Sequence, residues 1–409
     1  MRGDEMNYQT LHSLYYKDES KWNREYQLRF CNPFTRHFNI EIRQFRHRHS
    51  HSAFYCPTEE ILLLQDCIMS EFVQLIGVLQ AIPGVGIKQF LHSCLVEEIK
   101  SSNDIEGVRS TRKEIRLALA ATPEERRKLR LGGIVSKYIK ILNRESIPLS
   151  TCNDIRALYD ELLSDEIRRE DPSNLPDGKI FRKGSVDILA PSQKTVHRGI
   201  FPEEKIIRDM DAALGILHDQ AIPFFVRIAV FHYLFGYIHP FYDGNGRTSR
   251  LITSYLLANY LHPAIALRLS IDLKKQHRQY YKLFSATDAE INKGDLTPFI
   301  IGTLQFIRAS SIYTKEILTK RFARYKSYEK KLENLSISNQ TLAGIYNILL
   351  QAAIFSDFGG ATITEIKDTL QKSENTIKSR LKEIPDSHII ITKSSRPYHY
   401  RLNLGMFQI

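Results

Sequence analysis

The residues best suited to chemistry lie in one short stretch, HPFYDGNGRTSR, from His239 to Arg250. His239 is the one side chain in it whose pKa ordinarily lies near neutrality, which suits a base that takes a proton from a hydroxyl group. Asp243 supplies a hard carboxylate oxygen of the kind that Mg²⁺ binds. Arg247 and Arg250 stand three positions apart, so on a helix both guanidinium groups share a face and can clamp phosphate oxygens.

The small residues of the same stretch shape its backbone. Gly244, Asn245 and Gly246 leave few Cβ atoms in the way, so N–H groups can turn inward as an anion-binding nest. RTSRLITSYLLANYL, which follows, has helical periodicity, and a helix N-terminus also favours phosphate. Phe241 is expected to point inward and fix the loop against the core. These parts predict phosphoryl or nucleotidyl transfer rather than a turn whose arginines merely cap carbonyl groups.

The elements around this stretch can be inferred from hydrophobic periodicity, which is helical over most of the chain. Apolar residues recur at three-and-four spacing over 58–82 and over most of 202–261. IPGVG is expected to break the first of these helices before KQFLHSCLVEEI begins the next. FRKGSVDILAPSQKTVHRG alternates like a short β-hairpin. The candidate site is therefore expected at the mouth of a helical core.

The C-terminal segment has a pattern of its own. TLAGIYNILLQAA, ATITEIKDTLQ and SENTIKSRLKEI predict three helices, and HIIITKSSRPYHYRLN predicts two short strands around a basic turn. This order is typical of a winged helix. Lys378, Arg380 and Lys382 could contact DNA phosphates. A protein-interaction module is narrowly favoured instead, because Glu374 and Glu383 dilute that charge.

Composition sets broad limits. The chain has 409 residues, 43% of them hydrophobic, enough for two or three domains, and its net charge of +11 weakly favours polyanionic partners. Five scattered cysteines without CxxC spacing predict reduced thiols in a cytosolic protein. No secretory signal is recognised and polar residues interrupt the longest apolar stretch, so we expect no membrane span and a cytoplasmic location. The histidines of HRHSH lack an acidic or cysteine partner nearby in sequence, which predicts a solvated loop.

HPFYDGNGRTSR matches, position for position, the HxFx(D/E)GNGRxxR signature of the Fic family, whose best-known members are protein adenylyltransferases (AMPylators). The resemblance extends over roughly residues 60 to 310, including GDLTPFI. It implies a mainly α fold: a Fic helical core with a β-hairpin flap, an N-terminal helical segment and a C-terminal winged-helix-like α+β domain. The expected divisions are 1–57 (structure uncertain), 58–125 (N-terminal helices), 126–310 (Fic core), 311–338 (basic linker helix) and 339–409 (winged-helix-like domain).

The resemblance also implies roles for the central motif. His239 would be the general base that deprotonates a Ser, Thr or Tyr hydroxyl, and Asp243 would hold Mg²⁺ on the α- and β-phosphates of ATP. Family members that transfer a terminal phosphate tend to carry a bulkier basic residue at the position of Gly244, so glycine there favours transfer of AMP. The remaining phosphate contacts would come from Gly244, Asn245, Gly246 and Arg247, with Arg250 meeting the γ-phosphate.

An upstream stretch, SSNDIEG, resembles the inhibitory motif (S/T)xxxE(G/N) of Fic proteins that are regulated from an N-terminal helix. Ser102, Glu106 and Gly107 stand in the matching places. A carboxylate paired with Arg250 would take the position that the γ-phosphate needs, so ATP would bind badly or unproductively. The alternative is a surface glutamate before a C-capping glycine. In some relatives the same glutamate supports removal of AMP, so the reverse reaction stays open.

Two further groups of contacts follow from the same resemblance. The hairpin is similar to the Fic flap, which pairs with the target backbone as an added strand. Its working edge is expected at Thr195, Val196 and His197. QYYKLFSATDAEINKGD resembles the adenine-binding stretch and suggests Tyr280 and Asn292 as contacts, with Asp288 as a rival to Asn292 because the spacing is longer than usual. Tyr280 fits equally well as a plain core residue.

The sequence thus predicts a protein adenylyltransferase that uses ATP and Mg²⁺ and is autoinhibited by Glu106 against Arg250. Its expected partners are ATP and a protein with a hydroxyl side chain, itself included. A homodimer and DNA binding stay open. Two alternatives remain: a Fic enzyme that removes AMP, and a DNA-binding regulator that uses the C-terminal segment.

Overall fold

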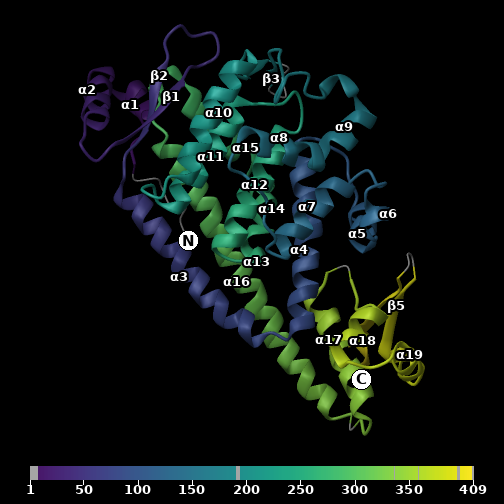
Figure 1. Ribbon diagram of the computed structural model, residues 1–409. Coiled ribbons are helices and arrows are strands. Elements are labelled where there is room, and N and C mark those ends of the chain that lie inside the picture. The colour runs from purple at the N-terminus through teal and green to yellow at the C-terminus, as the bar shows by residue number, and fades with distance from the viewer. Residues whose placement is uncertain (1–7, 190–193, 336, 358, 394–396, 408–409) are drawn as a thin grey trace.

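The computed structural model describes residues 8–189, 194–335, 337–357, 359–393 and 397–407 (Figure 1). The fold is mainly α-helical, and the described strands form three separate two-stranded antiparallel hairpins. The strands are β1 (Arg36–Ile42), β2 (His51–Tyr55), β3 (Asp187–Leu189), β4 (Thr195–Arg198), β5 (Ile389–Thr392) and β6 (His399–Leu402). The helices are α1 (Leu11–Lys17), α2 (Glu19–Phe30), α3 (Glu59–Ala81), α4 (Gly84–Ile105), α5 (Arg112–Ala120), α6 (Pro123–Arg126), α7 (Gly132–Leu142), α8 (Cys152–Tyr159), α9 (Asp165–Glu170), α10 (Glu203–His218), α11 (Phe224–Ile238), α12 (Asn245–Tyr260), α13 (Pro263–Ala266), α14 (Leu269–Lys275), α15 (His277–Asp288), α16 (Thr297–Glu333), α17 (Gln340–Phe355), α18 (Ile363–Leu370) and α19 (Glu374–Lys382).

The candidate motif lies between α11 and α12, two helices at the centre of the core. Most residues of α11 are buried, because this helix is apolar all round and packs against α10, α12 and α16. On α12 the buried residues include the small polar side chains Thr248, Ser249 and Ser254. The turn from α11 into α12 is therefore held from both sides by packed helices, as the sequence predicts.

The two longest helices, α3 and α16, lie side by side along one flank of the molecule (Figure 1). The helical periodicity over 58–82 predicts α3 almost to the residue. By length and composition α3 is apolar enough to cross a membrane, so the expectation of no membrane span stays a prediction. The core helix of a soluble protein passes the same test.

The first 57 residues contain structure that the sequence analysis did not anticipate. Helices α1 and α2 pack on the β1–β2 hairpin through a small core of Leu11, Leu14 and Phe54. Strand β2 also pairs with the turn before α16: the amide of Phe54 donates to Gly294 O (3.1 Å) and the amide of Leu296 donates to Phe54 O (2.8 Å). The N-terminal segment is thereby joined to the helical core.

The C-terminal segment packs on the first half of α4. The amide of Gly86 donates to Gln351 Oε1 on α17 (2.9 Å), and the hydroxyl groups of Ser93 and Ser356 are 3.1 Å apart. Three helices and then the β5–β6 hairpin occur in the predicted order. The assignment of this segment as a winged helix stays a prediction.

Two details of the sequence analysis bear comparison with the structure. The IPGVG break is confined to Ile82 and Pro83, because Pro83 has no N–H to continue α3, and α4 already begins at Gly84. All five cysteines are free, as predicted.

Candidate active site

His239 ends α11 in a left-handed backbone conformation (φ 54°, ψ 63°), which turns the chain sharply into the motif. Its Nδ1 lies 3.2 Å from the carbonyl oxygen of Gly236. A carbonyl can only accept, so Nδ1 carries the hydrogen and Nε2 keeps its lone pair. Burial, with smaller contributions from His197 and Arg182, lowers the pKa of His239 to about 3. The imidazole is therefore neutral near pH 7 and able to act as a base.

Arg182 holds the backbone that presents His239. Its guanidinium is fully buried and donates to the carbonyl oxygens of His239 (2.9 Å), Ile200 (2.8 Å), Ile238 (3.4 Å) and Gly184. Burial lowers the pKa of Arg182 to about 10, and the group stays charged at neutral pH. Arg182 thus connects the end of α11 to the segments that precede and follow the flap, at Gly184 and Ile200.

The loop between His239 and α12 is fixed by its own side chains. Phe241 is fully buried and stacks on Tyr159 with ring centroids 3.7 Å apart, as its predicted inward orientation requires. The side chain of Asn245 accepts from the Phe241 amide (2.9 Å) and donates to the Phe241 carbonyl (2.8 Å). The Asn245 side chain therefore closes the loop, which leaves its backbone for the predicted anion hole.

Gly244 has a local reason to be glycine. Its φ is +80°, and a Cβ there would overlap Cδ1 of Leu163. Any larger residue would be strained both by the positive φ and by the overlap with Leu163. The glycine is consequently required by packing and backbone conformation, which weakens its use as a sign of which phosphate group is transferred.

Asp243 and Arg247 form a chain of charges with a residue that the sequence analysis missed. Arg247 is fully buried; its Nη1 lies 2.9 Å from Oε1 of Glu166 on α9, and its Nη2 lies 3.4 Å from Oδ2 of Asp243. With Glu166 already beside it, Arg247 orients Asp243. The Asp243 carboxylate is 42% exposed. One accessible carboxylate beside the predicted phosphate-binding nest fits Mg²⁺, which usually binds proteins through one or two carboxylates, substrate phosphates and water.

Arg250 is buried and all three of its nitrogens bond to the end of α4. Nη1 lies 2.8 Å from Glu106 Oε1, Nε lies 3.0 Å from Ser102 Oγ, and Nη2 lies 2.8 Å from Ser102 O. Burial alone would lower the pKa of Arg250, but the nearby carboxylate of Glu106 raises it overall. The predicted pairing of Glu106 with Arg250 is thus present as a contact.

The same carboxylate lies directly on the backbone of the motif. A Cβ built on Gly246 would overlap Glu106 Oε1 and would lie 2.8 Å from Arg250 Nη1. Gly246 is in the first turn of α12, where free N–H groups attract an anion. Glu106 therefore brings a negative charge to the position where the sequence predicts phosphate.

The last turn of α4 is fastened on its outer side as well. Asp104 pairs with Lys100 (2.8 Å) and with Lys274 (2.6 Å), and the hydroxyl of Tyr281 donates to Ile105 O (3.2 Å). Gly107 then ends the helix with φ +72°. It is a C-capping glycine, as in the alternative interpretation, but the glutamate before it faces Arg250 rather than bulk solvent.

The flap is partly as expected. Val196 points outward and is 46% exposed, while Thr195 is half-buried. His197 is buried, which corrects its assignment to the working edge: its Nε2 donates to Tyr237 O (2.7 Å) and its Nδ1 lies 3.3 Å from Asp288. Successive strand residues point to opposite sides, so His197 anchors the flap. Burial alone would lower the pKa of His197, but Asp288 raises it overall.

Of the predicted adenine contacts, Tyr280 lies beside the motif, because its ring is close enough to Arg250 to contribute to the raised pKa of that arginine. The hydroxyl of Tyr280 also lies 2.8 Å from Nε2 of buried His232, so the ring is packed in the core. Asn292 is buried and donates to backbone carbonyls of its own turn. Asp288 accepts from the hydroxyl of Tyr233 (2.6 Å). Tyr281, 46% exposed, also lies near Arg250, at the end of α4.

Arg182, Glu166 and Tyr281 are the contributors that the sequence analysis missed. Arg182 acts on main-chain carbonyls, which leave no trace in side-chain patterns, and Glu166 lies 81 residues before Arg247 in the chain. Tyr281 had a signal, the YY pair, but the pattern did not choose between the two rings.

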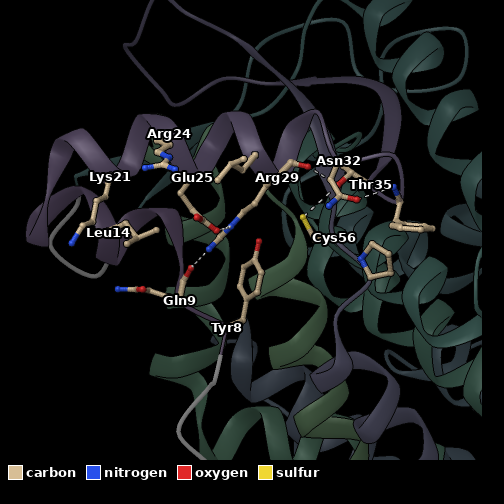
Figure 2. Close-up of a pocket in the computed structure, with 13 residues that line it drawn as sticks. Tyr8, Gln9, Leu14, Lys21, Arg24, Glu25, Arg29, Asn32, Thr35 and Cys56 are labelled. Atoms are coloured by element: carbon tan, nitrogen blue, oxygen red, sulfur yellow. Dashed lines mark hydrogen bonds and ion pairs between the residues drawn. The ribbon is translucent and has the colours of Figure 1, made fainter.

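A separate cavity of about 1010 Å³ opens between α2 and the entry to β1, far from the motif in sequence (Figure 2). Figure 2 shows Arg29 reaching toward Glu25 and the carbonyl of Gln9, with Tyr8 beside it. None of the predicted site residues lines this cavity. It is not a candidate for the nucleotide site.

With this geometry in view, comparison with known proteins places the chain. Residues 149–257 match the model of the Fic/DOC family, so this part of the chain is a Fic domain. The predicted presence of a Fic domain is confirmed.

The related sequences bear the name of an enzyme. The chain is 40% identical over 72 residues to "Protein adenylyltransferase Fic" of Drosophila grimshawi and 41% identical over 73 residues to the protein of that name from Aedes aegypti. Each match covers 18% of this chain and 13% of the relative, so the chain matches only a small part of those proteins.

Solved structures give low-identity matches. A Fic family protein from Desulfovibrio desulfuricans G20 is 20% identical, with a TM-score of 0.48 over 85% of this chain and 97% of that one. A Fic domain containing signaling protein from Bacteroides thetaiotaomicron is 19% identical, with a TM-score of 0.42 over 62% of this chain and 96% of that one.

Proposed function

We propose that this protein transfers AMP from ATP to a hydroxyl side chain of a protein, itself included, and that Glu106 restrains it. The observation that carries the proposal is the carboxylate of Glu106, which meets both Arg250 and the backbone at Gly246. A site that already attracts one anion at a helix N-terminus is suited to a phosphate group. The names of the partial relatives agree with adenylyl transfer.

The residues support the steps in order. The hydroxyl oxygen of the target would attack the α-phosphorus of ATP, and the bond from that phosphorus to the β-phosphate oxygen would break, releasing pyrophosphate. The hydroxyl proton would pass to Nε2 of His239, whose lone pair the Gly236 carbonyl leaves free. Asp243 would hold Mg²⁺, which neutralises phosphate charge when bound. Arg250 would bind the phosphate end once Glu106 leaves.

Restraint follows from the charge that already faces Arg250. Three of its five N–H donors are engaged by Ser102 and Glu106. A γ-phosphate at Arg250 would lie against the Glu106 carboxylate, and two anions held against one cation would repel each other. We therefore propose that the resting protein transfers AMP slowly and that displacement of Glu106 speeds transfer.

The deciding experiment follows label from ATP into the protein. Wild type, Glu106→Gly, and Glu106→Gly with His239→Ala are each incubated with Mg²⁺ and either α-³²P-ATP or γ-³²P-ATP. We expect α-label on Glu106→Gly, at least tenfold less on wild type, and none on the double variant. Label from the γ-phosphate would instead identify a kinase-like transfer. No label from either nucleotide, with ATP binding intact, would overturn the proposal.

A further inference from the structure

The loop between β1 and β2, residues 43–50 (RQFRHRHS), is the most basic segment near the flap. It contains Arg43, Arg46 and Arg48 with two histidines and no acidic residue. All three arginines are exposed. The sequence predicts only a solvated loop here, and the active-site chemistry does not use it.

The loop is anchored to the helix that carries the proposed base. The amide of Arg43 donates to the hydroxyl of Tyr237 (2.8 Å), and Tyr237 lies two positions before His239 on α11. The next residue, Gln44, accepts through Oε1 from the amide of Glu290 (2.7 Å). These bonds fix the base of the loop against the core, beside the site.

The loop also contacts the flap strand. Two guanidinium groups lie near the ring of Phe45, that of Arg198 on β4 at 5.1 Å and that of Arg46 at 5.2 Å. Arg46 is close enough to Asp187 on β3 to help lower the pKa of its carboxyl, below the larger effect of Arg198. The loop therefore lies beside both flap strands.

The carboxylates near this surface already have partners. Asp187 forms an ion pair with Arg198 (2.5 Å), Glu41 accepts from the hydroxyl of Ser50 (2.7 Å), and Glu290 lies 3.2 Å from His51. The positive charge of the loop arginines is thus left facing solvent. A protein segment held along the flap would pass beside it.

We propose that the loop 43–50 recognises an acidic segment of the protein substrate next to the hydroxyl that accepts AMP. This inference rests on the proposed function, because only a flap that holds a target places that target beside the loop. Guanidinium groups pair well with carboxylates through two parallel hydrogen bonds. Exposed charges of this kind mainly accelerate encounter and select partners, and salt weakens them. A nucleic acid is disfavoured because the basic loop is short and lies beside the flap, where a polypeptide is expected.

The test uses peptides of one design on the full chain carrying Glu106→Gly. Each peptide has Ser, Thr and Tyr at its centre, flanked by four Glu, four Lys or four Gln residues, and α-³²P-ATP supplies the label. We expect kcat/KM for the Glu peptide to exceed that for the Lys peptide about tenfold at low salt, and the preference to vanish at high salt. Arg46→Glu with Arg48→Glu should abolish or reverse the preference while leaving the Gln peptide unchanged.

A matched control carries Lys320→Glu with Arg324→Glu, two exposed cations one turn apart on α16, and should keep the preference. Equal labelling of all peptides, or an unchanged preference in the loop variant, would overturn the inference alone, provided that the protein still labels itself. Failure of self-labelling and peptide labelling together would count against the proposed function instead. Loss of duplex-oligonucleotide binding in the loop variant without loss of peptide preference would assign the surface to nucleic acid and reject our proposal.

Discussion

The guanidinium of Arg182 donates to the carbonyl oxygen of His239 at 2.9 Å, and it does so with no solvent exposure. The proposed base thus depends on a residue 57 positions earlier for the backbone conformation that presents its ring. A buried cation whose partners are main-chain carbonyls is costly to remove, since the carbonyls would be left unsatisfied.

Replacing Arg182 with Gln should therefore affect chemistry more than nucleotide binding. In the Glu106→Gly background we expect kcat for AMP transfer to fall about 100-fold, with the Kd for ATP changed less than threefold. The free energy of unfolding should drop by about 2 kcal/mol or more. Arg126→Gln is the control, because that arginine also caps carbonyls, those of Ala118, Leu119 and Ala121, but lies away from the site. A fall in ATP affinity equal to the fall in kcat would contradict a positioning role.

The charge on Glu106 should govern ATP affinity. Glu106→Gln keeps the shape of the side chain but removes its charge, so ATP should bind at least tenfold more tightly by calorimetry. Glu97→Gln is the matched control and should leave ATP affinity unchanged, since Glu97 lies on the same helix but pairs with Arg112. Equal ATP affinity in wild type and Glu106→Gln would show that the carboxylate does not compete with nucleotide.

Glu98 should make stability depend on pH. Its carboxyl is fully buried, and burial raises its pKa from 4.5 to about 7 despite hydrogen bonds from Ser270 and Ser254. A raised carboxyl pKa means that the folded state binds the extra proton, so this contribution to stability is present below pH 4.5 and is lost as pH rises toward 7. Across that range the loss is on the order of 3 kcal/mol.

Chemical denaturation of wild type and Glu98→Gln at several pH values measures this effect. Histidines such as His232, whose pKa burial lowers to about 3, give slopes of the opposite sign, but they are common to both proteins and cancel in the difference. We expect the difference between the two free energies to grow with pH in favour of Glu98→Gln. A difference that does not vary with pH would refute the assignment.

Two glycines with similar backbone angles should differ in their tolerance of alanine. Gly107 (φ +72°) has open space where an added Cβ would stand, with nothing within 4 Å, so Gly107→Ala should cost only about 1 kcal/mol of backbone strain. Gly244 (φ +80°) would add an overlap with Leu163, so Gly244→Ala should cost about 2 kcal/mol more. Thermal or urea unfolding of the Gly107→Ala and Gly244→Ala variants measures the loss in free energy of unfolding for each. Equal costs would mean that Leu163 moves aside freely.

The contact between α4 and the C-terminal segment should be sensitive at Gly86. A Cβ there would lie 2.8 and 3.1 Å from the ring of Phe355, so Gly86→Val should loosen the contact with α17. We expect limited proteolysis to release the C-terminal segment at least tenfold faster than in wild type. Gly77→Val is the control, since its position in α3 is open. Unchanged cleavage would show that the contact tolerates the added bulk.

The sequence was sufficient for the features that are local. Twelve consecutive residues identified the motif, and helical periodicity located α3, α11 and α12, because each signal depends on near neighbours. The contact between Glu106 and Arg250, which are 144 positions apart, is predicted only because SSNDIEG forms a second motif. The β1–β2 hairpin was missed because part of its pairing is to residues near 294, and His197 was misplaced because a register shift in the flap hides which side faces inward.

Helix α4 connects the contact with the C-terminal segment to the contact between Glu106 and Arg250. Its 22 residues span about 33 Å, with Gly86 and Ser93 in its first half against the C-terminal segment and Glu106 just past its last turn against Arg250. A helix of this length is stiff, so a tilt of about 3° at one end moves the other by more than an ångström. That displacement is comparable to the difference between a hydrogen bond and a broken one. A small tilt of α4 at the C-terminal segment would therefore be enough to break the Glu106–Arg250 contact at its other end.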